Sequence, residues 1–520
     1  MPNLANKNIQ KMKCYNPPLE GRRGSDCLLL DFNERTTPYG DVIKKALEKM
    51  LTEDKMQIYP EYGNVAKEIA NYTKTKPQNI IITNGSDQAI DLVFRTFTKT
   101  NDEVIIPSPS FAMFYQCAKS VGNKIISPLY KGKNLSFPTQ ETLDKINSNT
   151  KLIIICNPNN PTGTLVSVKD IEAIIRKAPK AVVLVDEAYA EFSGVTTIPL
   201  IKKYKNLIIT RTFSKAFGLA ALRIGYAIGN QKTLVEMMKV RGPYDINMPA
   251  LCAAKAALKN LNPLYSYVDE VMNISKPMLE NYFKKEKIKF YPSQANFILF
   301  IPRDASQTFE YLKNKNFLTR PRNDGLIKDT IRVTLGTAQQ TAEFINAYKK
   351  IIQKNQKKYV FIDRDGTLIY EPTPKDTKLG DIPYQIDSFD KLKILPGVIE
   401  GLQELINKKY RLVLISNQDG LGTKNFPQAN FDGAQNKMLK IFKDNEIEFE
   451  EIFICSHLPE DNCNCRKPKT GLLDNFIKNK NIDWKKSIVI GNSNADKGLA
   501  KNLKLKFIKI KTNQAFKLNI

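Results

Sequence analysis

Residues 211–225 read RTFSKAFGLAALRIG and follow the apolar run Leu207–Ile209. A lysine that lies beside a second cation and is partly removed from water has a lowered pKa and can form a Schiff base. Lys215 fits this description, and Ser214 and Arg223 carry the hydroxyl and guanidinium groups that suit a phosphate. Because a lone Ser-Lys pair is usually only a surface feature, the interpretation depends on the segments that precede it.

Polar turns follow several earlier apolar runs, at the places where open α/β sheets bind ligands. The turn Thr83–Asp87 opens a helix whose backbone N–H groups suit a phosphate, and Phe111 could stack on a planar ring. Asp186 could keep a pyridine nitrogen protonated, while Asn160 and Tyr189 could bond the phenolic oxygen of that ring. The order of these segments predicts a pyridoxal phosphate site. Its expected contacts are Gly85, Ser86, Asp87, Phe111, Asn160, Asp186, Tyr189, Ser214, Lys215 and Arg223.

Short apolar runs alternate with amphipathic stretches between about residues 31 and 350. This alternation predicts an α/β fold with a parallel, doubly wound sheet. A second series of the same kind follows, so we expect two domains, residues 1–355 and 356–520. The expected strands are Ile80–Ile82, Val104–Ile106, Leu152–Ile155, Val182–Val185 and Leu207–Ile209 in the first series, and Tyr359–Ile362, Leu412–Ile415 and Ile488–Ile490 in the second.

Two aspartates, Asp363 and Asp365, follow the run Tyr359–Ile362 directly. Carboxylates so placed can divide the work of phosphate transfer: one attacks phosphorus, and the other protonates the leaving alcohol and later activates water. A bound Mg²⁺ would offset their charge. An acidic loop alone is more often a solvated turn, but other polar turns support this one. They offer Ser416, Asn417 and Gln418 for phosphate oxygens, Arg466 and Lys467 for the transition-state charge, and Asn492 for the metal.

Three of the eight cysteines are bunched around His457, the only histidine of the chain. Cys455, His457, Cys463 and Cys465 suit tetrahedral Zn²⁺, and a closed set of four such ligands indicates a structural site. The alternative is a reduced loop without metal, which the use of the single histidine at ligand spacing disfavours. The scattered cysteines are interpreted as reduced packing residues.

The net charge is +26, yet lysine and arginine are spread along the whole chain without a basic tail. We therefore expect no nucleic-acid site, although a positive field would attract phosphorylated substrates. No apolar run reaches the length that crosses a bilayer, and the first residues lack the apolar stretch of a secretion signal. The expectation is a cytoplasmic protein without a membrane partner.

The first two-thirds of the chain resembles the fold-type I aminotransferases, and among them the histidinol-phosphate aminotransferases. The shared motifs are Tyr59-Pro60, Asn84–Asp87, Asn157–Gly163, Asp186–Phe192, Arg211–Gly225, Ser293–Phe297 and Ile331–Thr337. The resemblance implies a large doubly wound sheet domain, a small α/β domain, and pyridoxal phosphate carried by Lys215. It also implies that Tyr59 reaches the cofactor phosphate from a partner subunit, and hence a homodimer.

The same resemblance assigns the substrate contacts. Arg332 would hold the carboxylate of the amino donor, glutamate, while Arg320 and Tyr15 would face the substrate phosphate. The segment Arg35–Pro38 differs from the usual sequence of the family at this place.

Residues from about 358 to 508 are similar to phosphatases of the haloacid dehalogenase type, above all to the histidinol-phosphatase domain of bifunctional histidine-biosynthesis proteins. The similarity implies a Rossmann-like domain with a zinc loop. Asn492 stands where that family has an aspartate ligand of Mg²⁺, which predicts weaker metal binding unless Asp496 compensates. The loop from Glu371 to Lys391 is longer than in the family, and its role cannot be read from the sequence.

The two resemblances together imply consecutive steps of histidine synthesis: transamination of imidazole-acetol phosphate, then hydrolysis of histidinol phosphate. One alternative is an aminotransferase for another aromatic or phosphorylated substrate. For the second domain the alternatives are a sugar phosphate such as heptose bisphosphate, or an inactive, structural role.

Overall fold

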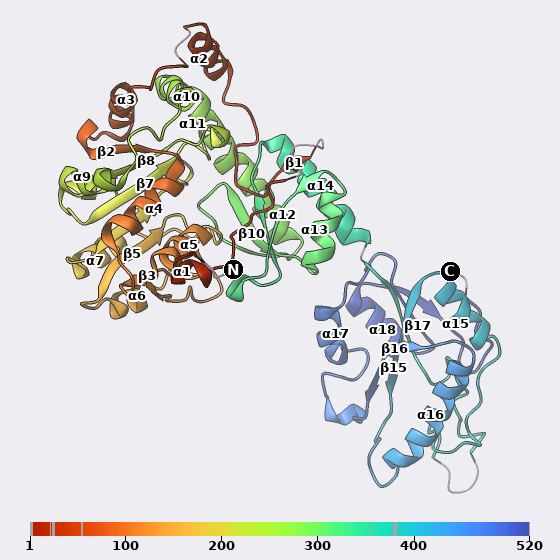
Figure 1. The fold of residues 1–520 in the computed structure, drawn as a ribbon. Coiled ribbons are helices and arrows are strands. Elements are labelled where there is room, and N and C mark those ends of the chain that lie inside the picture. The colour runs from red at the N-terminus through yellow and green to blue at the C-terminus, as the bar shows by residue number, and fades with distance from the viewer. Residues whose placement is uncertain are drawn as a thin grey trace. The chain divides into compact units, whose positions relative to one another are not determined.

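The computed structural model describes residues 4–20, 22, 27–53, 56–354, 356–377 and 382–518. The chain divides into two compact units, here called the larger unit, Met1–Lys349, and the smaller unit, Lys350–Ile520 (Figure 1). The domain boundary predicted at residue 355 lies outside the described residues. Within the described ranges, no helix has both the length and the apolar character that a membrane span requires.

The larger unit is built on a seven-stranded sheet with the order β2-β8-β7-β6-β5-β3-β4. All five apolar runs predicted for this part of the chain form strands of this sheet. Its strands are β2 Ile80–Thr83, β3 Glu103–Ile105, β4 Lys124–Ile126, β5 Thr150–Cys156, β6 Val182–Asp186, β7 Leu207–Thr212 and β8 Gly225–Gly229.

The direction of β8 differs from the predicted all-parallel sheet, because β8 runs antiparallel to both β2 and β7. The connection from β7 to β8 contains only the 3₁₀ turn Ala220–Leu222 and no helix that could return the chain across the sheet. Parallel neighbours need such a crossover, so the chain folds back instead. This keeps the segment with Lys215 at the end of the sheet where β5, β6 and β7 also end.

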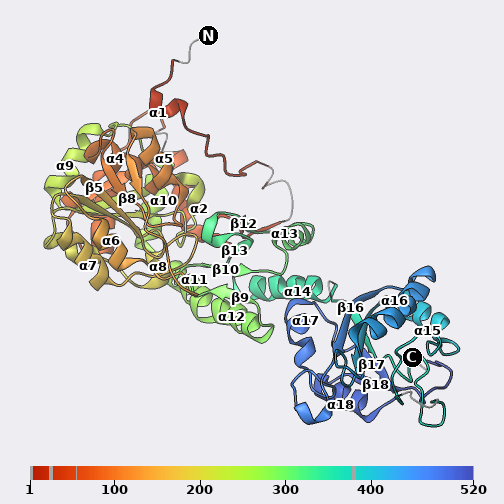
Figure 2. The same cartoon turned by 90° about the horizontal axis from the view of Figure 1, so that it is seen from below.

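Helices α4 Gly85–Phe97, α5 Ala112–Val121 and α9 Gln231–Val240 cover one face of this sheet (Figure 2). Their apolar side chains share one core with alternate residues of the strands, among them Ile154 and Leu184. The other helices of this unit are α1 Lys7–Gln10, α2 Asp41–Thr52, α3 Gly63–Thr73, α6 Thr139–Lys145, α7 Val168–Lys177, α8 Ala190–Ser193, α10 Met248–Lys259, α11 Asn262–Asp269, α12 Lys276–Lys285 and α13 Ala305–Lys313. The helix α14 Ala338–Lys354 begins in this unit and continues past its last residue.

A second, antiparallel sheet of four strands lies in the C-terminal part of the larger unit, with the order β12-β13-β10-β9. Its strands are β9 Lys289–Tyr291, β10 Phe297–Ile301, β12 Arg320–Arg322 and β13 Thr330–Thr334. Two short strands, β1 Leu28–Leu29 and β11 Phe317–Leu318, pair in parallel beside it. This is the small α/β domain expected from the sequence.

The smaller unit contains a five-stranded parallel sheet with the order β16-β15-β14-β17-β18. The three predicted runs of this part form its three central strands. The strands are β14 Lys358–Ile362, β15 Tyr410–Asn417, β16 Phe449–Cys455, β17 Ile488–Gly491 and β18 Lys506–Lys509, and the helices are α15 Val398–Asn407, α16 Gln428–Asp444, α17 Asp474–Asn479 and α18 Asn494–Leu503.

Successive residues of β14 face two different cores. Val360 and Ile362 pack with α15 and α16, whereas Tyr359 and Phe361 pack with α17 and α18. Figure 2 shows these two pairs of helices on opposite sides of the sheet. Because the central strand is buried on both faces, the residue that follows it, Asp363, has a fixed position at the carboxyl edge of the sheet.

Candidate active sites and metal cluster

A cavity of about 1160 Å³ lies where the strands of the large sheet end. The structure brings most of the predicted cofactor and substrate residues together around it. Gly85 and Tyr59 do not line it. The predicted residues that do are Tyr15, Ser86, Asp87, Phe111, Asn160, Asp186, Tyr189, Ser214, Lys215, Arg223, Arg320 and Arg332.

The amine of Lys215 lies inside this cavity and donates a hydrogen bond to the carbonyl oxygen of Phe32 at 2.7 Å. Burial, together with the nearby Arg332, lowers the pKa of Lys215 to about 8. A lowered pKa increases the fraction of the neutral amine, which is the nucleophilic form.

The carboxylate of Asp186 is buried at the end of β6. It accepts hydrogen bonds from the hydroxyl of Thr210 at 2.9 Å and from the thiol of Cys156 at 3.7 Å. Burial raises the pKa of Asp186 to about 6. An opposite charge beside such a carboxyl favours its ionised form. A protonated ring nitrogen is therefore the kind of partner that suits this position.

The N-terminus of α4 forms a close-packed turn suited to a phosphate. Gly85 has a φ of +70°, and a Cβ there would lie 2.6 Å from Nη2 of Arg223. A Cβ on Gly225 would lie 2.6 Å from the backbone nitrogen of Ser86. Arg223 also lies 3.1 Å from the carboxylate of Asp87. Glycine at both positions lets backbone N–H groups and a guanidinium meet at one place.

Tyr189 and Asn160 are each held by a hydrogen bond from a neighbouring side chain. The amide of Asn33 donates to the Tyr189 hydroxyl at 2.9 Å. The guanidinium of Arg332 donates to Oδ1 of Asn160 and to the carbonyl oxygen of Asp31, both at 2.5 Å. Burial lowers the pKa of Arg332 to about 10. A buried arginine with a cavity before it is suited to an anionic ligand.

Arginines gather at the far end of the same cavity. Arg320 pairs directly with Arg332 across β12 and β13, and Arg322 stands two residues further along the same strand. All three line the cavity, and Nε of Arg322 is buried without a hydrogen-bond partner among the described residues. Sequence reasoning missed Arg322, although its spacing from Arg320 places both side chains on one face of the strand.

Tyr59 lies on an exposed apolar face rather than in the cavity. It is 71 % exposed and stacks on Tyr244 with 4.3 Å between ring centroids. Its neighbours Met56 and Ile58 are 67 % and 60 % exposed. The role expected of Tyr59 involves a second copy of the chain and stays a prediction.

In the smaller unit, Asp363 lies beside a buried lysine. Nζ of Lys467 is 2.5 Å from Asp363 Oδ1 and 2.7 Å from Asp496 Oδ1, and the hydroxyl of Thr367 donates to Asp363 Oδ2 at 3.0 Å. Burial raises the pKa of Asp363 to about 7, although the lysine opposes this effect. Burial alone would lower the pKa of Lys467, but the two carboxylates raise it to about 12.

Asp365 has a different set of partners. Its Oδ2 accepts from the amide of Gln418 at 2.5 Å and from the hydroxyl of Ser416 at 3.2 Å. The guanidinium of Arg364 donates to Oδ1 at 2.9 Å. Arg364 was not predicted, and Gln418 was expected to hold phosphate oxygens rather than Asp365. In the sequence, only position indicated these two contacts. Arg364 lies between the two aspartates, and Gln418 follows Ser416 and Asn417.

Two predicted phosphate contacts are engaged with the protein itself. The side chain of Asn417 accepts from the backbone nitrogen of Lys467 at 3.0 Å and donates to its carbonyl oxygen at 3.3 Å. Arg466 forms an ion pair with Asp419. Asn417 therefore holds the backbone that carries Lys467.

Asn492 and Glu371 both lie against Gly366. A Cβ on Gly366 would be 2.2 Å from Nδ2 of Asn492 and 3.2 Å from Oε2 of Glu371. The Asn492 nitrogen donates to Thr512 at 3.2 Å, which leaves oxygen Oδ1 available to a metal. Burial, with Asp365 nearby, raises the pKa of Glu371 to about 7. The loop that the sequence left without a role therefore begins with a carboxyl at this site.

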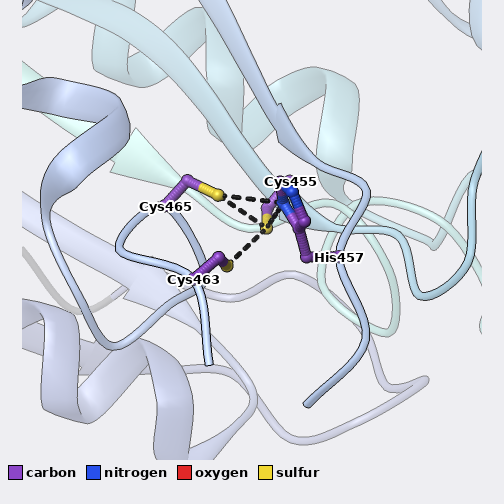
Figure 3. Close-up of side chains that lie close together, drawn as sticks. All are labelled: Cys455, His457, Cys463 and Cys465. Atoms are coloured by element: carbon purple, nitrogen blue, oxygen red, sulfur yellow. Dashed lines mark hydrogen bonds between the residues drawn. The ribbon is translucent and has the colours of Figure 1, made fainter. Parts of the chain in front are cut away.

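Figure 3 shows the side chains of Cys455, His457, Cys463 and Cys465 pointing toward one another. Their ligand atoms all lie within 4.8 Å of one another. The sulfur of Cys455 is 3.7 Å from that of Cys463 and 3.3 Å from that of Cys465. Nδ1 of His457 lies 3.7 Å and 3.1 Å from the sulfurs of Cys455 and Cys465. Tetrahedral Zn²⁺ with thiolate ligands places sulfurs about 3.8 Å apart, so the cluster nearly has the required dimensions.

The sequence of the larger unit was compared with those of known protein families. Residues 25–347 match the family described as aminotransferase class I and II. The chain belongs to this family. Two relatives named histidinol-phosphate aminotransferase, from Ruminiclostridium cellulolyticum and Caldanaerobacter subterraneus subsp. tengcongensis, are each 34% identical to the aminotransferase part. The matches cover 60% and 62% of this chain and 89% and 92% of the two relatives.

The fold of the aminotransferase part is also found in solved structures. The histidinol-phosphate aminotransferase of Sinorhizobium meliloti, in complex with pyridoxal-5'-phosphate, matches with a TM-score of 0.62 and 21% identity. The match covers 68% of this chain and 98% of that chain. Beyond the aminotransferase, residues 358–516 match the family described as polynucleotide kinase 3 phosphatase, which fits a phosphatase fused to the first unit.

Proposed function

We propose that the chain is a bifunctional, cytoplasmic enzyme of histidine biosynthesis. The larger unit would transfer the amino group of glutamate to imidazole-acetol phosphate, giving histidinol phosphate and 2-oxoglutarate. The smaller unit would hydrolyse histidinol phosphate to histidinol and phosphate. The observation that carries the proposal is that relatives named histidinol-phosphate aminotransferase match the first unit, while a phosphatase family matches the second.

The residues around the large cavity fit pyridoxal phosphate. The buried Asp186 suits a protonated pyridine nitrogen, and the turn formed by Gly85, Ser86 and Arg223 suits the phosphate. When bound, the cofactor supplies an electron sink for the bonds to the substrate α-carbon. Lys215 would hold the cofactor and then move the proton to and from that carbon through Nζ.

The arginines of the cavity would bind the substrates. Arg332, which donates to Asn160, would hold the carboxylate of glutamate. Arg320, with Arg322 beside it, would bind the phosphate of the second substrate, and Tyr15 would complete this contact. Cations that lie directly opposite each other on neighbouring strands repel, so an anion between them relieves that repulsion.

In the smaller unit Asp363 would attack phosphorus and Asp365 would protonate the leaving alcohol. Lys467, which is paired with Asp363 and Asp496, would stabilise the negative charge of the transferred phosphoryl group. Mg²⁺ would be held by Asp363, Asp365 and Asn492 and would offset their charge together with that of the phosphate. The fit rests on hard oxygen donors around Gly366 and on the Asn492 oxygen, which the bond to Thr512 leaves available.

The cluster of Cys455, His457, Cys463 and Cys465 would hold a structural Zn²⁺, because four soft or borderline ligands close the tetrahedron. Cys465 precedes Lys467 by two residues in the chain. A metal at this place would brace the loop that presents Lys467 to the phosphate.

A homodimer of the larger unit is part of the proposal. Met56, Ile58, Tyr59 and Tyr244 form an exposed apolar face, which a second copy would cover. The stacked Tyr59 would then complete the phosphate end of the partner's cavity.

The test is phosphate release from purified protein given L-histidinol phosphate and Mg²⁺, with Asp363→Asn as the control. Release that disappears in the variant supports the phosphatase and, with it, the consecutive-step proposal. Absence of release, while histidinol phosphate still converts the bound cofactor to its amine form, would leave an aminotransferase with an inactive or differently specific second unit.

A second candidate substrate for the smaller unit is a 3'-phosphorylated polynucleotide. It is favoured by the description of the family that matches residues 358–516. A 3'-phosphorylated oligonucleotide and a heptose bisphosphate belong in the same release assay. Faster release from either would assign the smaller unit to that substrate class.

A further inference from the structure

Among the described residues, six arginines line the large cavity of the aminotransferase part. Three of them are paired with carboxylates: Arg22, Arg223 and Arg322. The other three, Arg35, Arg320 and Arg332, form no ion pair with a carboxylate of the described structure. A guanidinium that is partly removed from water without a counter-ion is costly, and an anionic ligand removes that cost. Arg332 and Arg320 have such ligands in the proposed function, whereas Arg35 has none.

The side chain of Arg35 is held by two aromatic rings and by the backbone. Its guanidinium carbon lies 4.2 Å from the ring centre of Tyr267 and 5.2 Å from that of Tyr39, and both tyrosines are buried. Nε donates to the carbonyl oxygen of Thr37 and Nη1 to that of Ala216, both at 3.1 Å. Nη2 has no hydrogen-bond partner among the described residues, so it is available to a ligand in the cavity.

The charge of Arg35 is not compensated by an acidic neighbour. Burial lowers the pKa of Arg35, and the groups that oppose this effect are Tyr267 and Tyr39. Burial also raises the pKa of Tyr39 to about 12 and raises that of Tyr267, so both hydroxyls are uncharged at neutral pH. Arg35 therefore presents a positive charge to the cavity without a negative partner.

Arg35 and Arg332 belong to different parts of the cavity lining. Arg332 lies on β13 and contacts Asn160, whereas Arg35 contacts the loop that carries Lys215. The packing against this loop is close, because a Cβ on Gly218 would lie 2.8 Å from Cδ of Arg35. A substrate at Lys215 therefore meets unpaired cations from two different elements of the fold.

The two proposed substrates differ in where they carry negative charge. Histidinol phosphate carries its phosphate on the carbon that replaces the α-carboxylate of an amino acid. When both L-substrates present the same hydrogen for removal, the second carboxylate of glutamate takes the place of the imidazole ring. Arg332 and Arg320, neighbours across β12 and β13, serve the first position. The second position must accept a carboxylate in one half-reaction and a neutral ring in the other. A guanidinium suits both, because its edge pairs with carboxylates and its face stacks on aromatic rings.

We infer that Arg35 is a specificity-determining residue that binds the side-chain carboxylate of the amino donor, glutamate. The inference rests on the proposed function, because it takes glutamate and histidinol phosphate as the alternating substrates. The Nη2 group of Arg35 donates to the carboxylate, while Tyr267 and Tyr39 keep the guanidinium in place. The same guanidinium faces the imidazole ring when histidinol phosphate is bound, which lets one cavity serve both substrates.

The test compares the two half-reactions, in which glutamate or histidinol phosphate converts the bound cofactor to its amine form. Arg35→Met should lower the second-order rate constant for glutamate roughly 10–100-fold and that for histidinol phosphate less than about threefold, because only glutamate loses a charged hydrogen bond. Calorimetry gives a measure that does not depend on turnover. The Kd of glutarate, an unreactive dicarboxylate, should rise roughly 10–100-fold in the same variant.

Two further variants separate this role from a structural one. Arg35 also holds the carbonyl oxygen of Ala216, next to Lys215, so a structural role would slow both half-reactions equally. Arg35→Gln removes the charge but keeps an N–H donor for this carbonyl; it should show the same selective loss, and it decides if Arg35→Met does not fold. Arg35→Lys keeps the charge, so its ratio of the two rate constants should stay within about fivefold of the wild type. Equal losses for the two substrates, or an unchanged Kd of glutarate, would overturn the inference.

Failure of the proposed function gives a different result. Wild-type protein that does not react with glutamate would overturn the proposed amino donor and the role of Arg35 together. Wild-type protein that reacts with both substrates, without a selective loss in the variants at residue 35, would overturn only the role of Arg35.

Discussion

Replacing Asp363 with Asn is expected to stabilise the smaller unit at pH 8 while it abolishes phosphate release. The reason is the position of this carboxyl, which lies at the buried end of β14 with its pKa raised to about 7 by burial. In the unfolded chain the group titrates near its ordinary pKa of 3.8. The folded unit therefore binds this proton more tightly than the unfolded chain does.

The sign and size of the effect follow from this difference. Between about pH 4 and pH 7 the free energy of unfolding of the wild-type unit falls as the pH rises. In this range the unfolded chain has already lost the proton of Asp363, whereas the folded unit still binds it. A shift of about three pKa units corresponds to roughly 4 kcal/mol. Asparagine avoids this loss, and the opposing effect of Lys467 is already part of the raised pKa of Asp363. The gain at pH 8 is therefore at most roughly 4 kcal/mol, and at pH 4 the gain disappears.

The assay is urea denaturation followed by tryptophan fluorescence, without added divalent cations. Trp484 is the only tryptophan of the chain and lies in the smaller unit, so its emission reports that unit alone. Adding Mg²⁺ should reduce the difference between the two proteins, because the cation stabilises the ionised carboxyl of the wild type. Asp483→Asn, a change near Trp484 and outside the site, controls for local effects on the emission.

A difference in stability that does not grow between pH 4 and pH 8 would refute this account of Asp363. The same conclusion would follow if Asp363→Asn were the less stable protein at pH 8. Either result would mean that Lys467 compensates the buried carboxylate fully.

Three other changes test the remaining parts of the proposal. Asn492→Asp should raise the affinity for Mg²⁺ about tenfold in calorimetry, since it adds a charge at the metal, and an unchanged affinity would show that Asn492 is not a ligand. Cys463→Ser should lower the zinc content measured by mass spectrometry and the urea midpoint of Trp484 emission, whereas Cys252→Ser should change neither. Arg320→Met should raise KM for histidinol phosphate roughly 10–100-fold and leave KM for glutamate nearly unchanged; equal losses for both substrates would contradict the assignment of Arg320 to the phosphate.

Much of the fold was predictable because buried parallel strands are continuous apolar runs. All eight predicted runs form strands, and the residues that follow Leu152–Ile155 and Val182–Val185 line the large cavity. The direction of β8 was not predictable in the same way. The residues of an apolar run such as Gly225–Gly229 do not show whether the strand is parallel or antiparallel to its neighbours. The short connection before the run decides the direction of the strand.

The sites were predictable where one residue type has one chemical use, as with Lys215 or the cysteine cluster. Partners were missed where a common residue acts through its place in three dimensions. Arg322 shares a strand face with Arg320, and Gln418 donates to Asp365 from the turn that follows β15. Asn417 was expected to bind phosphate, yet its amide holds the backbone of Lys467. An amide fits both tasks equally well, so the sequence alone could not separate them.

His457, the one histidine of the chain, lies in the cysteine cluster of the smaller unit. Under the proposed function, the pathway ends in the amino acid that this protein contains only once. Translation of this chain therefore requires histidine at a single codon. A wrong residue at that codon would remove one ligand of the cluster and leave the larger unit intact. Starvation would thus damage the dephosphorylation step before the transamination step.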